Sequence, residues 1–444
     1  MTRTESVVSE NAFLVGITLP DAPVLEDPLA ELAGLAETAG ARVVGRLQQR
    51  RERPDTATYL GKGKVEELAG LVAAIDADVV IFDNDLSPAQ TRNLEKSLEV
   101  KVLDRTELIL DIFASRAQTH EARLAVELAQ LQYSLPRLKR MWTHLSRLKM
   151  GIGMRGPGEK QLEVDRRLVE RRIHDLQREI DTIHQRKERQ VAARSDRMTV
   201  SLVGYTNAGK STLLNALTGA DVKAEDKLFA TLDTRTRRWQ LPGWGPVLLS
   251  DTVGFIRQLP HELIASFRAT LEEARQANLL LHVADATSPD VFEQVTAVYR
   301  VLEEMGIEEK DTLLVLNKAD ALPDPARLDA LRLRYPHAVS VSALSGAGLD
   351  DLACAVSDAL SRSFIEVDIE TSVANGKLMA YLAASGEVLS KHYSNDRVRI
   401  HCRISPKYLG RLGSDAIVHH RNGAGAPVTI SGGRHDAGTA ASTS

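Results

Sequence analysis

The first hundred residues alternate short apolar runs with amphipathic stretches, and the two kinds of segment differ in hydrophobic period. Runs rich in Val, Ile and Phe predict strands at residues 13–17, 41–45, 78–82 and 100–104. Apolar residues at helical spacing predict helices over residues 28–39, 64–75 and 88–98. Alternation of this kind is typical of a small α/β domain with a mostly parallel sheet. We therefore predict an N-terminal α/β domain at residues 1–112.

From residue 113 the apolar positions follow steps of three and four, the seam of a coiled-coil-like helix. The first seam consists of Leu124, Leu128, Leu131, Leu135, Leu138, Leu145 and Leu148. The second consists of Leu162, Val169, Ile173, Leu176, Ile180 and Ile183. Residues 149–158 between them contain too much Gly and Pro for a continuous helix. The pattern predicts an antiparallel helical hairpin over 113–197, with a glycine-rich tip at 149–158 and a kink at Pro136.

Two further units follow the predicted hairpin. Residues 198–362 again alternate apolar strand-like runs with helical patterns, which predicts a second α/β domain. Beyond it, strands are expected near 364–369 and 397–403, with a helix over 377–392 between them, so residues 363–421 form a small α+β domain. Residues 422–444 are rich in Gly, Ala, Ser and Thr, and we expect a disordered tail there.

The amino-acid composition indicates a soluble, multidomain protein. A chain of 444 residues with 43% hydrophobic and 26% charged residues is ordinary for a soluble protein of three or four domains. It has no apolar run long enough to span a membrane, and its first residues lack a signal core. We expect a cytoplasmic monomer, with peripheral membrane attachment left open. Cys354 and Cys402 lack metal-ligand spacing, and we expect both to be small buried hydrophobes.

Charge is distributed unevenly along the chain. The formal net charge is −4, but residues 137–197 contain 17 Lys and Arg against 9 Asp and Glu, a net of +8. The rest of the chain therefore carries −12. Such asymmetry favours a polyanionic partner. The alternative is a long solvated helix of mixed charge.

A phosphate-binding motif opens the second α/β unit. Residues 204–212 read G-x-x-x-x-G-K-S-T directly after a β-like run. Backbone N–H groups of such a loop surround a β-phosphate at a helix N-terminus, the lysine reaches the β- and γ-phosphates, and the hydroxyl binds Mg²⁺. The predicted contacts are Gly204, Tyr205, Thr206, Asn207, Ala208, Gly209, Lys210, Ser211 and Thr212.

Two later motifs specify guanine. The first is Asn317, Lys318, Ala319 and Asp320, at the end of the strand-like run 312–316. Asp320 is suited to accept hydrogen bonds from guanine N1–H and the exocyclic amine, which adenine does not present in that polarity. Asn317 supports the loop and Lys318 packs over the base. The second motif, Ser342, Ala343 and Leu344, offers a backbone N–H to guanine O6.

Two segments between these motifs are predicted to contact Mg²⁺ and the γ-phosphate. Asp251, Thr252, Val253 and Gly254 follow a strand-like run, so Asp251 is suited to hold Mg²⁺ through water and Gly254 to donate its N–H to the γ-phosphate. Phe229, Ala230 and Thr231 lie in a loop between the first motif and this one. Thr231 is the candidate that completes Mg²⁺ coordination, the alternative being an ordinary loop threonine.

The sequence assigns catalysis to Lys210, Thr231 and Gly254, with one substitution. Phe255 stands where many GTPases carry the Gln that orients the attacking water, so we expect slow intrinsic hydrolysis. Asn207 is a candidate to hold K⁺ against the phosphates, with a loop-capping role as the alternative. Arg257 is another source of positive charge, but we expect it to face solvent.

These residues together resemble the HflX family of bacterial translation-associated GTPases over nearly the whole chain. Further matching segments are residues 59–67, 104–113, 127–131, 151–159 and 161–163. The resemblance implies GTP hydrolysis coupled to the 50S ribosomal subunit, splitting of stalled or idle 70S ribosomes, and a glycine-rich tip that approaches the peptidyl-transferase centre. The chain departs from the family pattern at Thr234, where a Pro is usual, and at Lys160, where a small polar residue is common.

The predicted hairpin also suits RNA from its residues alone. Residues 137–160 carry seven cations and one acid, and cations of this kind neutralise phosphates with little sequence selectivity. Aromatic side chains such as Trp142 stack on bases. The candidate rRNA contacts are Lys149, Arg155, Lys160 and Trp142. The alternative is a hairpin folded back on the GTPase domain.

The expected fold class is a multidomain α/β protein. A P-loop GTPase domain with a parallel sheet flanked by helices is joined to the N-terminal α/β domain, the long hairpin and the small α+β domain. The leading function is a 50S-binding GTPase that dissociates or rescues ribosomes. A large-subunit assembly GTPase and a protein-partner signalling GTPase are the alternatives. An ATP-driven RNA-remodelling role has little support, since the N-terminal domain has no Walker motif.

Overall fold

The computed structural model describes most of the chain, and the descriptions below are restricted to these ranges. They are residues 9–20, 25–138, 157–193, 198–219, 228–229, 234–242, 245–257, 273–304, 306–307, 311–322, 324–362, 364–394, 396–404, 409 and 416–420. Most of the predicted tip at 149–158 and the predicted tail at 422–444 lie outside them.

The N-terminal unit is built on a four-stranded parallel sheet. Its strands, in the order β2-β1-β3-β4, are β1 (Asn11–Thr18), β2 (Arg42–Arg50), β3 (Val79–Phe82) and β4 (Lys101–Asp104). Its helices are α1 (Ala30–Thr38), α2 (Lys62–Ile75), α3 (Pro88–Leu98) and α4 (Arg105–Arg116). Apolar residues of α1 and α4 pack on one face of the sheet and those of α2 and α3 on the other. The prediction of an α/β unit with a parallel sheet is confirmed.

A helical region follows, and its two arms run antiparallel. The arms are α5 (His120–Ser134), which continues into the 3₁₀ turn η1 (Leu135–Arg137), and the long helix α7 (Pro157–Ala193). Arg172 on α7 pairs with Glu127 on α5, and Glu179 approaches His120, so residue numbers on one arm fall as those on the other rise. The predicted seams meet in a small core that contains Leu124, Leu128, Leu176 and Ile180. Pro136 lies in η1, where the α-helix has ended.

The third unit is a six-stranded sheet with helices packed on it. Its strands, in the order β10-β9-β8-β5-β7-β6, are β5 (Thr199–Gly204), β6 (Arg235–Leu241), β7 (Gly245–Asp251), β8 (Leu279–Asp285), β9 (Thr312–Asn317) and β10 (Val339–Ser340). Only β6 pairs antiparallel. Its helices are α8 (Lys210–Thr218), α11 (Val291–Glu304), α12 (Pro325–Arg334) and α13 (Leu349–Arg362), with a 3₁₀ turn η2 (Ala319–Ala321).

The C-terminal unit is an antiparallel sheet with one helix. Its elements are β11 (Ile365–Ser372), α14 (Gly376–Ser385), β12 (Gly386–Ser394), β13 (Arg397–Ile404) and β14 (Ile417–His420), and the strand order is β12-β13-β11-β14. The predicted helix over 377–392 is wrong beyond Ser385. Gly386 adopts an extended conformation that ends α14, and the residues after it pair along β13. The ladder with β13 satisfies backbone groups that a longer helix would have paired internally.

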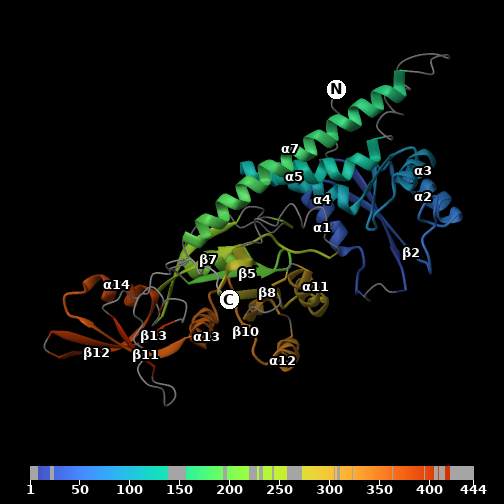
Figure 1. The fold of residues 1–444 in the computed structure, drawn as a ribbon. Helices are drawn as coiled ribbons and strands as arrows, with labels where there is room; N and C mark the ends of the chain where they lie inside the picture. The colour runs from blue at the N-terminus through green and yellow to red at the C-terminus, as the bar shows by residue number, and fades with distance from the viewer. Residues whose placement is uncertain are drawn as a thin grey trace, which may run out of the picture.

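Two hydrophobic cores cross from one unit to the next. One joins the α1 and α4 side of the N-terminal sheet to α5 and to the third unit, where it includes Phe229 and Phe255. The other joins the third unit to the C-terminal sheet. Figure 1 shows the units in sequence, with α7 lying along α5. Helix α4 runs across the predicted domain boundary at residue 112. All the predicted domain boundaries stay predictions.

Two other expectations concern membranes and cysteine. Among the described residues, no helix has the length and apolar character needed to cross a membrane. Cys402 is buried in the C-terminal core, as predicted. The prediction for Cys354 is wrong, because this residue lies on an exposed face of α13, where an amphipathic helix turns away from the core.

Candidate nucleotide-binding site

The phosphate-loop motif connects the end of β5 to the start of α8, at the carboxyl edge of a parallel sheet. Ligands of open α/β sheets bind at this edge. Gly204 has φ of +150°, and a Cβ there would lie 2.1 Å from the carbonyl oxygen of Val283. Gly209 has φ of +87°, and its Cβ would lie 2.3 Å from Nδ2 of Asn317. The loop therefore needs glycine at both positions, for backbone conformation and for space.

Lys210 is buried in this loop, and backbone carbonyl groups of the loop hold its side chain. The Nζ atom donates to the carbonyl oxygens of Gly204 at 3.0 Å and Tyr205 at 2.8 Å, and the residue is only 6% exposed. Burial lowers the pKa of Lys210 to about 8, and the nearby Asp251 carboxylate only partly opposes this. A polyanion placed in the loop would favour the charged form.

Oxygen atoms suited to a hard cation meet beside Lys210. The Ser211 hydroxyl, on the first turn of α8, donates to Oδ2 of Asp251 at 2.6 Å, and Asp251 is fully buried at the end of β7. Mg²⁺ in phosphate sites is held by one or two such protein oxygens together with the substrate phosphates. The described residues contain no group of three or more His, Cys, Asp or Glu placed to hold a metal ion. Ser211 and Asp251 therefore fit Mg²⁺ that is shared with a nucleotide.

The two guanine motifs are tied to the phosphate loop through Asn317. Its Nδ2 donates to the carbonyl oxygen of Ala208 at 2.9 Å, and its Oδ1 accepts from the N–H of Ala343 at 3.0 Å. Lys318, which has φ of +60°, forms an ion pair with Asp285 at 2.8 Å. Asp320 is exposed beside the buried Asn317. One amide thus links three loops, and the phosphate-loop residue that it reaches lies 109 residues earlier in the sequence.

Residues after Asp251 lie against the phosphate loop. Phe255 forms a β-bridge with Tyr205. The Thr206 N–H donates to the Phe255 carbonyl oxygen at 2.7 Å, and the Phe255 N–H donates to the Gly204 carbonyl oxygen at 3.1 Å. A Cβ at Gly254 would lie 2.7 Å from Cα of Thr206 and 3.1 Å from Nζ of Lys210. Gly254 therefore packs closely against the phosphate loop, beside the Lys210 ammonium group.

The side chains of Phe229 and Phe255 face the N-terminal unit. Phe255 is 2% exposed within the core that α1 and α4 share with the third unit. The Phe229 ring contacts that of Phe113 on α4 edge to face, with centroids 4.5 Å apart, while its N–H donates to the Thr206 hydroxyl at 2.9 Å. Phe255 is thus a packing residue at the domain interface, in addition to being unable to bind water.

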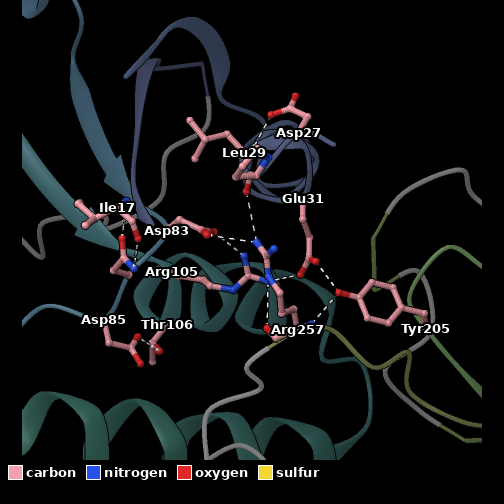
Figure 2. Close-up of polar contacts among 12 residues, drawn as sticks. Ile17, Asp27, Leu29, Glu31, Asp83, Asp85, Arg105, Thr106, Tyr205 and Arg257 are labelled. Atoms are coloured by element: carbon pink, nitrogen blue, oxygen red, sulfur yellow. Dashed lines mark hydrogen bonds and ion pairs between the residues drawn. The ribbon is translucent and has the colours of Figure 1, made fainter. Parts of the chain in front are cut away.

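A partly buried polar network joins the N-terminal unit to this site, and Figure 2 shows it. Arg105, at the start of α4, is 3% exposed and pairs with Glu31 on α1 and, at 2.7 Å, with Asp83. The Tyr205 hydroxyl donates to Glu31 and accepts from the N–H of Arg257 at 2.7 Å. Arg105 also donates to the Arg257 carbonyl oxygen at 3.1 Å. Both the phosphate loop and the segment after Gly254 are therefore held by the N-terminal unit.

The pKa shifts of Arg105 and Tyr205 are consistent with these contacts. Burial alone lowers the pKa of Arg105, but Glu31 and Asp83 outweigh burial and raise it overall. Burial raises the pKa of the Tyr205 hydroxyl well above its usual range, and the Glu31 carboxylate raises it further. Arg105 therefore stays cationic and Tyr205 stays a neutral donor, which keeps the network intact across the physiological pH range.

Sequence reasoning missed this network and misjudged one member. The prediction that Arg257 faces solvent is wrong: its side chain is 19% exposed, pairs with Asp83 at 3.2 Å and donates to the Pro28 carbonyl oxygen at 3.3 Å. An arginine directly after a buried strand, as at Arg105, was a usable signal of a buried partner. Nothing local in the sequence identifies Glu31 as that partner.

Several predicted residues lie outside the described ranges. Ala230 and Thr231 are among them, as are the RNA-contact candidates Trp142, Lys149 and Arg155. Lys160 lies within α7, but its side chain is not described. Their roles stay predictions.

Three family models match successive parts of the chain. Residues 26–114 match a family model described as GTP-binding GTPase N-terminal, residues 116–194 one described as GTP-binding GTPase Middle Region, and residues 199–318 one described as 50S ribosome-binding GTPase. A solved GTP-binding protein from Sulfolobus solfataricus in complex with GDP is 24% identical, with 79% of this chain and 99% of that chain covered and a TM-score of 0.42.

Curated relatives cover most of the chain. The GTPase HflX of Escherichia coli strain K12 is 49% identical over 372 residues, which are 83% of this chain and 87% of that protein. The GTPase HflX of Lacrimispora saccharolytica is 43% identical over 411 residues, 92% of this chain and 97% of that protein. With these relatives and a P-loop GTPase domain, the chain hydrolyses GTP to GDP and phosphate. It belongs to the GTPase HflX family.

Proposed function

We propose that this GTPase binds the 50S ribosomal subunit through its helical hairpin and dissociates or rescues 70S ribosomes, with GTP hydrolysis stimulated by the ribosome. The model that matches residues 199–318 is described as a 50S ribosome-binding GTPase. The +8 charge of residues 137–197 supplies the independent support, since such a segment suits the phosphate backbone of rRNA.

The length of α7 is the observation that carries the proposal. Its 37 residues correspond to about 55 Å at ~1.5 Å per residue, and its Ala193 end leads toward β5 of the GTPase domain. The other end of the helix, at Pro157, adjoins the glycine-rich segment in the sequence. A projecting element of this length presents cations far from the nucleotide, which suits a large partner. We therefore assign Lys149, Arg155, Lys160 and Trp142 as candidate rRNA contacts.

Within the GTP site we assign roles by chemistry. Asn317 to Asp320 and Ser342 to Leu344 recognise guanine, residues 204–212 hold the phosphates, and Phe229 to Thr231 with Asp251 to Gly254 complete the γ-phosphate side. Ser211 and Thr231 would bind Mg²⁺ directly and Asp251 through water, where the ion neutralises charge on the phosphates. Lys210 and the Gly254 N–H stabilise the charge that develops during transfer.

The test is GTP turnover measured with and without purified 50S subunits. We expect strong stimulation, because Phe255 cannot orient water and an external partner must complete the positioning. Turnover unchanged by 50S subunits would favour a switch that acts on a protein partner. Sedimentation of mature 70S ribosomes after incubation with the protein and GTP then separates the proposal from an assembly GTPase, since only a splitting factor releases free subunits.

A further inference from the structure

Asp104, the last residue of β4, holds the first arm of the hairpin. The Tyr133 hydroxyl, near the end of α5, donates to its Oδ2 at 2.7 Å. Arg137 in η1 approaches the same oxygen at 3.4 Å, donates to the Leu86 carbonyl oxygen at 2.8 Å and lies over the Tyr133 ring at 3.6 Å. This cluster therefore fixes the far end of α5, from which the chain leads toward the tip.

Asp104 is also part of the framework of the N-terminal unit. Its Oδ1 accepts from the Glu107 N–H at 2.9 Å and so caps α4, and its Oδ2 accepts from the Leu86 N–H at 3.2 Å. It is 2% exposed. Burial raises the pKa of Asp104, while the bonds from Tyr133 and Glu107 and the charge of Arg137 oppose that rise. A buried carboxyl with this many partners has a fixed position.

The next residue, Arg105, holds the GTP site. It pairs with Glu31, which receives the Tyr205 hydroxyl of the phosphate loop, and it donates to the Arg257 carbonyl oxygen three residues after Gly254. Neighbouring residues at one strand end thus hold two different parts of the molecule. A peptide bond joins them, and α4 begins between them.

We propose that Asp104 and Arg105 are positioning residues that couple the far end of the first hairpin arm to the phosphate loop and to the segment after Gly254. A change in the direction of the first arm acts on Tyr133 and Arg137, then on Asp104, which caps α4. Because Arg105 is the first residue of that helix, a shift of the helix start also changes the contacts of Arg105 with Glu31 and Arg257. The route consists of hydrogen bonds and ion pairs joined by the peptide bond between Asp104 and Arg105, and networks of packed, bonded residues carry coupling between sites.

Thr106 provides a matched control. It follows Arg105, is buried to a similar degree, and donates to Oδ1 of Asp85 at 2.6 Å. This bond lies inside the N-terminal unit, as Figure 2 shows, and reaches neither the hairpin nor the GTPase domain. Thr106→Val removes one buried hydrogen bond without touching the proposed route, whereas Tyr133→Phe removes one on the route.

The first test uses the free protein and does not depend on any ribosomal role. Amide hydrogen exchange is measured over residues 254–257 in the wild type, Tyr133→Phe and Thr106→Val. We expect exchange there to be about five-fold faster in Tyr133→Phe, within the range that single residues of a coupled network produce, and unchanged in Thr106→Val. Equal exchange in all three proteins, or the same increase in both variants, would overturn the proposal.

The second test rests on the proposed 50S role. GTP turnover with 50S subunits is compared with intrinsic turnover, and binding is measured by co-sedimentation. We expect Tyr133→Phe to keep intrinsic turnover and 50S binding while its stimulation falls about five-fold. Full stimulation, or loss of binding itself, would contradict the coupling. If 50S subunits do not stimulate GTP turnover by the wild type, the proposed function is refuted. The coupling is then tested by the hydrogen-exchange experiment alone.

Discussion

At the scale of single residues, the position after Gly254 combines two properties. Phe255 cannot orient water, and its ring is buried in the core shared with the N-terminal unit while its backbone pairs with Tyr205. The substitution for Gln is therefore part of the domain interface as well as a feature of catalysis. A polar side chain at 255 would meet apolar neighbours before it met a nucleotide.

Phe255→Gln should consequently lower stability without raising intrinsic activity. We expect a loss of about 2–4 kcal/mol in the free energy of unfolding, from lost apolar burial and a buried amide. Denaturant unfolding and GTP turnover without ribosomes measure the two effects. An intrinsic rate well above that of the wild type would show that this side chain reaches the attacking water.

Lys210 leads to a prediction on pH. Its pKa in the free protein is lowered to about 8, below the usual range, so the cation is lost as pH rises through that value. Since phosphates bind the charged form, GTP affinity should weaken between about pH 7 and pH 9. A fluorescent GTP analogue titrated at several pH values measures this. Lys210→Met, which has no proton to lose there, should bind weakly with little dependence on pH over the same range.

Asn207 tests the cation hypothesis for the phosphate loop. It is exposed and has φ of +59°, a conformation that Asn and Gly tolerate. If its amide helps to hold K⁺, replacing K⁺ with Na⁺ should lower turnover in the wild type but not in Asn207→Gly, which keeps the backbone conformation. Equal turnover in both salts would remove K⁺ from the mechanism.

At the scale of elements, the hairpin shows what hydrophobic period predicts well. The seam through Leu124, Leu128, Leu176 and Ile180 forms the packing between α5 and α7, and the exposed pair Arg172–Glu127 flanks it. The same reasoning failed at β12, where helical propensity continued past Ser385 but the strand β13 offered a partner. Pairing between distant strands overrides local propensity, and no local pattern reveals it.

Leu176→Ala and Arg172→Ala separate the two contributions to the hairpin. Leu176 is fully buried, so its truncation should cost about 2–5 kcal/mol in unfolding free energy. The Arg172–Glu127 pair is solvent-exposed, so losing it should change stability very little. Urea unfolding of both variants provides the measurement. A larger effect from Arg172→Ala would mean that charge, rather than the seam, holds the arms together.

At the scale of the whole molecule, the sequence predicted the parts better than their assembly. The GTPase motifs fall at the strand ends where they were expected, since each is local to one turn. The contacts of Arg105 with Glu31 and Arg257 join residues from distant parts of the chain, and a single sequence carries no signal for such pairs. Residues 139–156 carry most of the predicted RNA contacts and lie outside the described structure.

Charge reversal at the tip tests the assembly as a whole. Arg155→Glu or Lys149→Glu should weaken 50S binding and reduce its salt dependence, because fewer counterions are released. GTP affinity should stay as in the wild type, since α7, about 55 Å long, lies between the tip and the GTPase domain along the chain. Co-sedimentation at several salt concentrations and GTP titration are the two measurements. Normal 50S binding by both variants would remove the tip from the interface.

The Asn317 side chain has a consequence for how the protein is loaded with nucleotide. Because this amide joins the loops around Ala208 and Ala343, one side chain holds the guanine motifs and the phosphate loop together. Loops that are already held in place lose little conformational freedom when a nucleotide binds, which favours tight binding.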